Sequence, residues 1–267
     1  MKVNRKTVAL AVSMLVAGAA LGQAQKVLGT IHTSGAEFKG ELKWKPREKA
    51  YAVIMDNGAR EVEVALADVV DIKIPKPKAL TDAEKQVREN PGAAIPELEK
   101  IAAAYLMLVW DKPATRHLAE AHLKANDAEK AARVCEAIIK PSPEDAYLGE
   151  VAPIYWQALM RTGKKGRAEE LIAKAIKSGD RTASAFALIM RGDLIRDEGD
   201  TNENAKKALK DGYLRVITLY ERERAARPEA LYKAAKCFEK TGQTDRADKF
   251  RTELKRDFAG SEWSSKL

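Results

Sequence analysis

Four turn-forming dipeptides recur at nearly regular intervals in the C-terminal part of the chain, and this spacing limits the fold more than any other feature. Asn126-Asp127, Gly163-Lys164, Gly199-Asp200 and Gly242-Gln243 lie 37, 36 and 43 residues apart. Amphipathic runs with a helical period flank each turn, so each unit predicts two antiparallel helices joined by a short loop. A single helical hairpin cannot bury its apolar face alone, and neighbouring hairpins therefore stack. The sequence predicts a row of helical hairpins.

Small, aromatic and glycine residues recur at matching positions inside these units, where the two helices of a hairpin approach closely. The sets are Ala235, Phe238, Gly242 and Ala247 in 231–254; Gly163, Ala168 and Ala175 in 155–176; and Ala119, Ala131 and a closing Pro143 in the first unit. Over residues 95–267 this pattern resembles the tetratricopeptide-repeat (TPR-like) superfamily, and residues 229–267 are most similar to its periplasmic Tol-Pal coordinator and outer-membrane assembly lipoprotein branches. Trp156 and Arg191 depart from that pattern. The resemblance implies an α-solenoid that serves as a protein-protein interaction scaffold.

Local signals indicate where the helices start. Thr81-Asp82-Ala83-Glu84 has the pattern of a capping box, and Asp127, Thr201 and Thr244 can each cap the helix that follows. One long helix is expected over residues 203–224. A compact bundle of alanine-rich helices, in place of a solenoid, remains the alternative.

The segment before the helices alternates apolar and polar residues with a period of two, which indicates β-strands at 27–32, 38–44, 51–56, 60–66 and 69–74. Asp56-Asn57-Gly58 is typical of a tight hairpin, because Asn and Gly tolerate positive φ. Pro75 and Pro77 end the sheet, since proline cannot donate to a strand ladder. Five short strands bury a core most simply by curling, so we expect a small SH3-like or Sm-like β barrel over 25–78 and a helical repeat domain over 79–267.

The segment 1–24 has the pattern of a signal peptide. Lys2, Arg5 and Lys6 precede an apolar run at 7–22, and Gly22-Gln23-Ala24 offers small residues where a signal peptidase cleaves. The apolar run is shorter than the roughly 20 residues of a membrane span. We therefore expect an exported protein of the periplasm or the secreted fraction, with no membrane span in the mature chain; an uncleaved anchor is the alternative.

The charge balance is modestly basic. The chain has a net charge of +8, and the segment 1–24 carries three of its 47 basic residues and none of its 39 acidic ones, which leaves the remainder at +5. The excess is spread along the sequence, and an exported protein rarely meets nucleic acid, so no nucleic-acid partner is expected.

Catalytic signatures are absent from the sequence. His117 and His122 are spaced so that they do not share one helix face at ligand distance, and no Gly-rich phosphate loop or nucleophile elbow occurs. Cys135 and Cys237 fall in different hairpins among apolar neighbours, which predicts two buried free thiols. We expect no catalytic residues, no cofactor, no metal and no enzymatic activity.

The first helix of each hairpin in such a stack lines the concave surface. Mapping the repeat onto this chain places both acidic and basic residues there, among them Glu120 and Asp193, with basic residues in excess. The predicted partner-binding residues are Arg116, Lys124, Gln157, Arg161, Arg196, Tyr232, Lys236 and Lys240. We expect them to bind an acidic or C-terminal segment of a protein partner, with Tyr232 as an apolar anchor. An ordinary solvated helix face is the alternative interpretation.

Two functional classes follow from these patterns. The first is a non-enzymatic scaffold or adaptor in the bacterial cell envelope that binds a partner segment along the repeats. The alternative is a cell-wall or carbohydrate-binding module that uses the β domain, through Trp44, Tyr51 and the basic run 39–49, with the repeats as a spacer. Trp263 could cap the stack or contact a partner, and self-association through the ends of the stack stays open.

Overall fold

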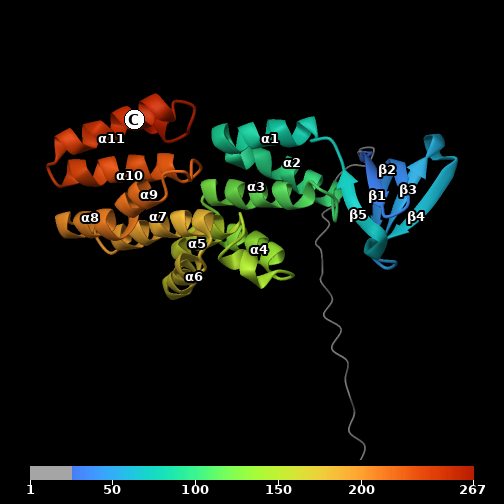
Figure 1. Cartoon of the computed structure of the whole chain (residues 1–267), viewed down its shortest axis with the longest axis horizontal. Coiled ribbons are helices and arrows are strands. Elements are labelled where there is room, and N and C mark those ends of the chain that lie inside the picture. The colour runs from blue at the N-terminus through green and yellow to red at the C-terminus, as the bar shows by residue number, and fades with distance from the viewer. Residues whose placement is uncertain (1–25) are drawn as a thin grey trace, which may run out of the picture.

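The computed structural model describes residues 26–267, and the predicted signal peptide lies outside the described residues. An antiparallel sheet comes first and a long array of helices follows (Figure 1). The strands are β1 Leu28–Thr33, β2 Glu37–Lys45, β3 Ala50–Met55, β4 Arg60–Ala65 and β5 Val69–Lys73. These bounds agree closely with the predicted strands.

The hairpin between β3 and β4 turns where the sequence predicts it. Asp56, Asn57 and Gly58 all adopt positive φ, of 52, 55 and 100°. Asn and Gly reach this region at low cost, which explains why the chain reverses at this point.

The predicted barrel is wrong in one respect, because the sheet does not close. Its strand order is β4-β3-β2-β1-β5, so β4 and β5 are two separate edges. Buried strand residues such as Ile31 and Val53 share one apolar cluster with Leu98 and Ile101 of the helices. The sheet therefore buries its apolar face against another element and need not curl until its edges meet.

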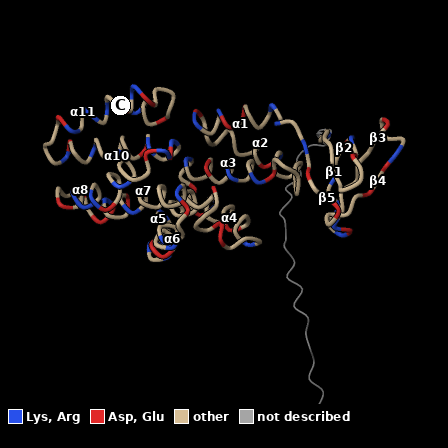
Figure 2. The backbone as a smooth tube through the Cα atoms, in the orientation of Figure 1, with Lys and Arg blue, Asp and Glu red and all other residues tan. Residues whose placement is uncertain are grey.

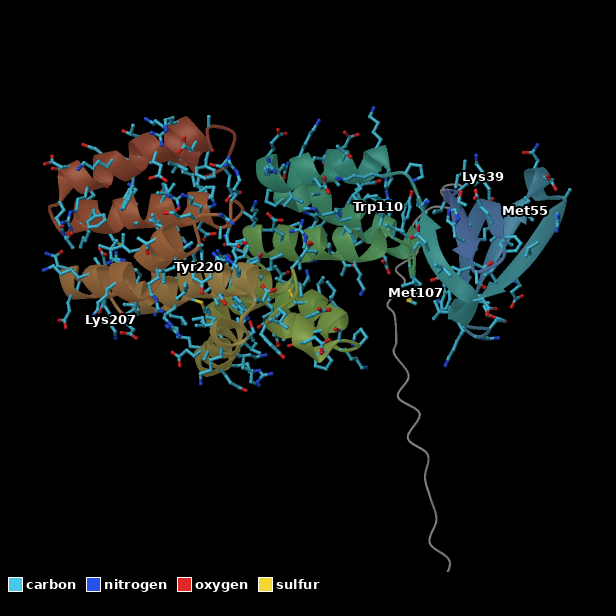
Figure 3. All side chains as sticks on the ribbon, in the orientation of Figure 1. Lys39, Met55, Met107, Trp110, Lys207 and Tyr220 are labelled. Atoms are coloured by element: carbon cyan, nitrogen blue, oxygen red, sulfur yellow. The ribbon has the colours of Figure 1, made fainter. Side chains whose placement is uncertain are left out.

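The loop between the second and third helices, residues 105–110, packs against the sheet. The Tyr51 hydroxyl donates to the Met107 carbonyl at 2.8 Å, and the Trp110 indole donates to the Ile74 carbonyl at 3.0 Å. Met107 and Trp110 lie at this junction in Figure 3. The two predicted domains thus meet through specific hydrogen bonds and a common core.

The helices pair as antiparallel neighbours along the rest of the chain. Their bounds are α1 Lys78–Glu89, α2 Pro91–Ala104, α3 Asp111–Lys124, α4 Ala128–Ile139, α5 Ala152–Arg161, α6 Lys165–Lys177, α7 Arg181–Asp197, α8 Asn202–Ala208, α9 Leu214–Leu219, α10 Arg227–Lys240 and α11 Thr244–Asp257. Asn126, Gly163 and Gly242 have φ of 64, 77 and 76°, as left-handed turn residues do. Of the helices in residues 26–267, none combines the length and the apolar character needed to cross a bilayer.

The predicted helix caps agree with the structure in part. Asp127 accepts a hydrogen bond from the Lys130 amide at 3.1 Å, and Thr201 accepts one from the Asn204 amide at 3.0 Å, so both cap their helices. Thr81 does not start a helix, because α1 already begins at Lys78 and the Thr81 amide donates back to the Pro77 carbonyl. α11 begins at Thr244 itself, with no side-chain cap before it.

The predicted long helix over 203–224 is interrupted. A π-helical turn, Leu209–Tyr213, separates α8 from α9, and α9 ends at Leu219. This turn crosses α7 at very short range, since a Cβ on Gly212 would lie 2.9 Å from the Cα of Gly192. A π turn contains one more residue than an α-helical turn, and this changes which residues face α7. As a result, the Tyr213 ring packs against Gly192 of α7.

The array curls, so that its far end returns to an early helix. The ammonium of Lys124 in α3 lies 3.4 Å from the carboxylate of Glu262, beyond α11. In Figure 1 the loop after α11 points back toward α1. The hairpins are therefore arranged around a central space and not in a straight row.

Two cysteines occupy separate cores of this array. Cys135 and Cys237 are free and buried, as the sequence predicts. Burial raises the pKa of the Cys135 thiol to about 12 and that of Cys237 to about 11. Both thiols therefore stay protonated and unreactive at neutral pH.

Candidate partner-binding groove

The inner surface of the curled array forms one large groove. Its volume is about 1120 Å³, and it is lined by α3, α5, α7 and α10 together with the segment after α11. These four helices are each the first helix of a hairpin, which is the arrangement the repeat predicts. The groove is therefore assembled from four successive units of the chain.

Apolar side chains cover much of the groove surface. They are Leu123, Leu148, Ala152, Pro153, Ile154, Trp156, Met160, Ala183, Phe186, Met190, Ala225 and Trp263. Phe186 and Met160 remain partly exposed, so a ligand can still bury apolar area on them. Beneath them, the Trp156 indole donates to the Ala146 carbonyl at 2.8 Å and anchors α5.

The charged lining is balanced, with six basic and six acidic side chains. They are Arg116, Lys124, Arg161, Arg196, Lys233 and Lys266 against Glu120, Glu150, Asp193, Asp197, Glu229 and Glu262. Figure 2 shows that Lys and Arg are interspersed with Asp and Glu along the helices of the described chain. The sequence predicts a basic excess because its mapping leaves out four acidic lining residues, Glu150, Asp197, Glu229 and Glu262.

One end of the groove holds a tight cluster on α3. Lys124 lies 2.9 Å from Glu120, and the His117 ring lies 3.4 Å from Glu120 and 3.1 Å from Glu84. Burial disfavours the charged form of Glu120, but its close contacts with His117 and Lys124 outweigh this effect and lower its pKa to about 2. Glu120 is therefore charged at neutral pH and already paired within the protein.

A second cluster lies at the α7–α10 end. The Lys233 ammonium is 2.5 Å from both Asp193 and Glu229, and the Tyr213 hydroxyl donates to Asp193 at 2.8 Å. Burial raises the pKa of Glu229 even though Lys233 is beside it. These groups satisfy one another, so they stabilise the wall of the groove and leave little charge for a ligand.

Arg161, between the two clusters, differs from the other basic residues of the groove. Its Nη1 donates to the Leu123 carbonyl at 2.8 Å, and within residues 26–267 no carboxylate lies within 4.0 Å of it. Its side chain is exposed at the C-terminal end of α5. A planar guanidinium with unused donors can receive an incoming carboxylate.

Five of the eight predicted partner-binding residues come together in the groove. Arg116, Lys124, Gln157, Arg161 and Arg196 line it. Of these, Arg196 is committed to Asp200 at the next turn and Arg116 contacts Glu150 at 3.6 Å.

The other three predicted residues do not line the groove. Lys236 lies 3.6 Å from Glu239 and Lys240 lies 2.9 Å from Asp200, while the Tyr232 ring packs at 5.4 Å from Trp263. The two lysines continue the helical stripe of Glu229 and Lys233, but farther along α10. The sequence prediction missed Glu229 and Lys233, which do line the groove. Helical spacing could have identified them, because they lie on the same face of α10 as Lys236, two turns and one turn before it.

The aromatic pair of the β domain belongs to the sheet's core contacts. Tyr51 is 2% exposed, and its ring centroid lies 4.8 Å from that of Trp44. With its hydroxyl bonded to Met107, Tyr51 serves the junction with the helices. A carbohydrate platform needs exposed ring faces, and Tyr51 does not offer one.

Comparison with known proteins adds one family relationship. The family model for the tetratricopeptide repeat matches residues 229–261, which contain most of α10 and all of α11. No curated protein matches the chain. The match and the paired helices together support a TPR-like superfamily, whose repeats act generally as non-enzymatic adaptors for protein partners.

Proposed function

We propose that the protein is an exported scaffold of the bacterial cell envelope that holds an acidic or C-terminal segment of a partner protein in its groove. One observation carries the proposal: Arg161 is the basic residue of the groove that has no carboxylate partner within residues 26–267. It lies beside a surface rich in apolar side chains. A segment with a carboxylate and a neighbouring apolar side chain complements both features.

The groove offers two kinds of contact to such a segment. A carboxylate accepts charge-assisted hydrogen bonds from the free nitrogens of Arg161, and Gln157 one turn earlier on α5 supplies neutral donors and acceptors. Apolar side chains bury area on Met160 and Phe186. The remaining charges are paired within the protein, so they contribute to the selection of partners more than to affinity.

The export part of the proposal rests on the segment 1–24, whose basic start and apolar run are typical of a signal peptide. Fractionation of cells that express the full chain tests it. We expect the protein in the periplasmic or medium fraction at the mass of a chain that starts near residue 25. Recovery of the full-length chain in the cytosol would refute export.

Site-specific photo-cross-linking tests the groove. A photo-reactive amino acid replaces Gln157 inside the groove or, as a control, exposed Glu169 on α6. We expect adducts with a recurrent protein at position 157 and not at position 169. Arg161→Gln should reduce the adduct at least tenfold, because loss of a charge-assisted hydrogen bond costs about 1.5 to 3 kcal/mol and each factor of ten in affinity corresponds to about 1.4 kcal/mol.

The matched control for Arg161→Gln is Arg167→Gln on α6, where the arginine pairs with Glu170 at 2.6 Å on the outer surface. This control should leave the adduct at position 157 unchanged. Equal adducts at positions 157 and 169, or equal effects of the two arginine substitutions, would contradict the proposal.

A further inference from the structure

The segment that follows α11, residues 258–267, forms one wall of the groove and also approaches α3. Glu262, Trp263 and Lys266 line the groove opposite α5 and α7. Glu262 also reaches Lys124 at 3.4 Å, across a separation of 138 residues in the chain. The last residues of the chain therefore complete a ring around the groove.

The contacts of this segment are unequal on its two sides. On the α10 side, Phe258 and Trp263 pack into the C-terminal core, the Trp263 ring lies 5.4 Å from Tyr232, and the Lys233 ammonium lies 5.5 Å from the centre of the Trp263 ring. This side holds the segment by apolar burial and cation–π contact.

On the α3 side, the contact between described residues is much weaker. The Lys124–Glu262 ion pair is the one hydrogen bond or ion pair that joins 258–267 to α1–α3 within residues 26–267. A cavity of about 390 Å³ remains between Gly260, Ser261 and the Glu84–Arg116 side of α1 and α3. The ring is therefore closed at this point by charge and not by packing.

Such an ion pair shifts an equilibrium only slightly. The side chains of Lys124 and Glu262 are 31% and 38% exposed, and pairs of this exposure change a population ratio by at most about fivefold. Salt weakens them further, since the Debye length falls to about 3 Å at 1 M. The closed ring can therefore open without unfolding of α10 or α11.

We propose that residues 258–267 are a latch whose Lys124–Glu262 ion pair controls access to the groove. The latch regulates the site of the proposed function and rests on it. In the closed state Lys124 contacts both Glu120 and Glu262. An acidic segment that enters the groove competes with Glu262 for Lys124 and releases the latch. The α10–α11 hairpin and the latch packed on it then move away from α3 together.

Electron–electron distances between two nitroxide labels measure the opening of the latch. One label is attached at Glu129→Cys in α4 and the other at Ala259→Cys in the latch. The two buried cysteines of this chain are replaced by alanine. Both label sites are exposed. At low salt, Glu262→Lys should lower the closed population at least threefold and lengthen the distance. In a Glu120→Gln background, which removes the other carboxylate beside position 124, the charge swap Glu262→Lys with Lys124→Glu should restore the closed distance, as a double-mutant cycle requires.

Asp248→Lys on the outer face of α11, where Asp248 pairs with Arg251, is the matched charge reversal and should leave the distance unchanged. The parent chain in 1 M NaCl should resemble Glu262→Lys. A distance that is insensitive to Glu262→Lys, or a charge swap that fails to restore it, overturns the latch whatever the groove binds.

Access to the groove is tested separately with the photo-reactive residue at Gln157 and Glu262→Gln, which leaves α3 unaltered. The adduct yield should rise threefold or more when the latch is open. An unchanged yield with the distance lengthened overturns the control of access while the scaffold proposal stands. Absence of any adduct in both forms overturns the proposed function, while the distance data still decide whether the ring opens.

Discussion

Replacement of Gly212 by alanine tests the close crossing that shapes the α7 wall of the groove. A Cβ at this position would lie 2.8 Å from the Leu188 carbonyl oxygen and 2.9 Å from the Cα of Gly192. Both neighbours are backbone atoms of α7, so no side-chain rotation relieves the contact and the two helices must separate.

The expected cost combines two opposing effects. Overpacking of a well-packed core costs about 3 kcal/mol at the upper end of its usual range. Alanine recovers about 1 kcal/mol of helix propensity relative to glycine. We therefore expect Gly212→Ala to lower the free energy of unfolding by about 2 kcal/mol.

Urea denaturation, followed by circular dichroism, measures this difference in the free energy of unfolding. An unchanged m-value would show that the substitution changes stability and not the compactness of either state. Gly166→Ala in α6 is the matched control, because nothing lies within 4 Å of its Cβ. It should raise stability by up to about 1 kcal/mol. If Gly212→Ala proves as stable as the parent chain, the helix crossing has been described wrongly.

Three further outcomes follow from named contacts. Because the pKa of Glu120 is lowered to about 2, its contribution of roughly 3 kcal/mol is present above pH 4.5 and lost as pH falls toward 2; denaturation at several pH values should show a steeper acid loss for the parent chain than for Glu120→Gln. Trp156→Phe should cost about 2 kcal/mol in urea melts, since the buried Ala146 carbonyl loses its donor, and a neutral result would contradict that bond. Tyr51→Phe should cost about 1 kcal/mol and speed proteolysis at the loop containing Met107; an unaltered cleavage rate would argue against the junction.

The groove was predictable in outline and not in detail. Repeat spacing alone placed Arg116, Gln157 and Arg161 on the inner surface, because the first helix of each hairpin faces the same way. Helical spacing gives Lys233 and Lys124 each a partner four residues earlier, but their second partners lie 40 and 138 positions away along the chain. No local pattern reports such distances.

Local features of the protein could be predicted from its residues alone: the strands, the turn at Asp56-Asn57-Gly58, the helical hairpins and the burial of both cysteines. These follow from side-chain period and from backbone preferences, which act over a few residues. Three features arise only from tertiary packing: the sheet stays open, a π turn at Leu209–Tyr213 interrupts the predicted long helix, and Glu262 contacts Lys124. These outcomes depend on which surfaces meet, and the free energy of such contacts is set by the assembled neighbours of a residue.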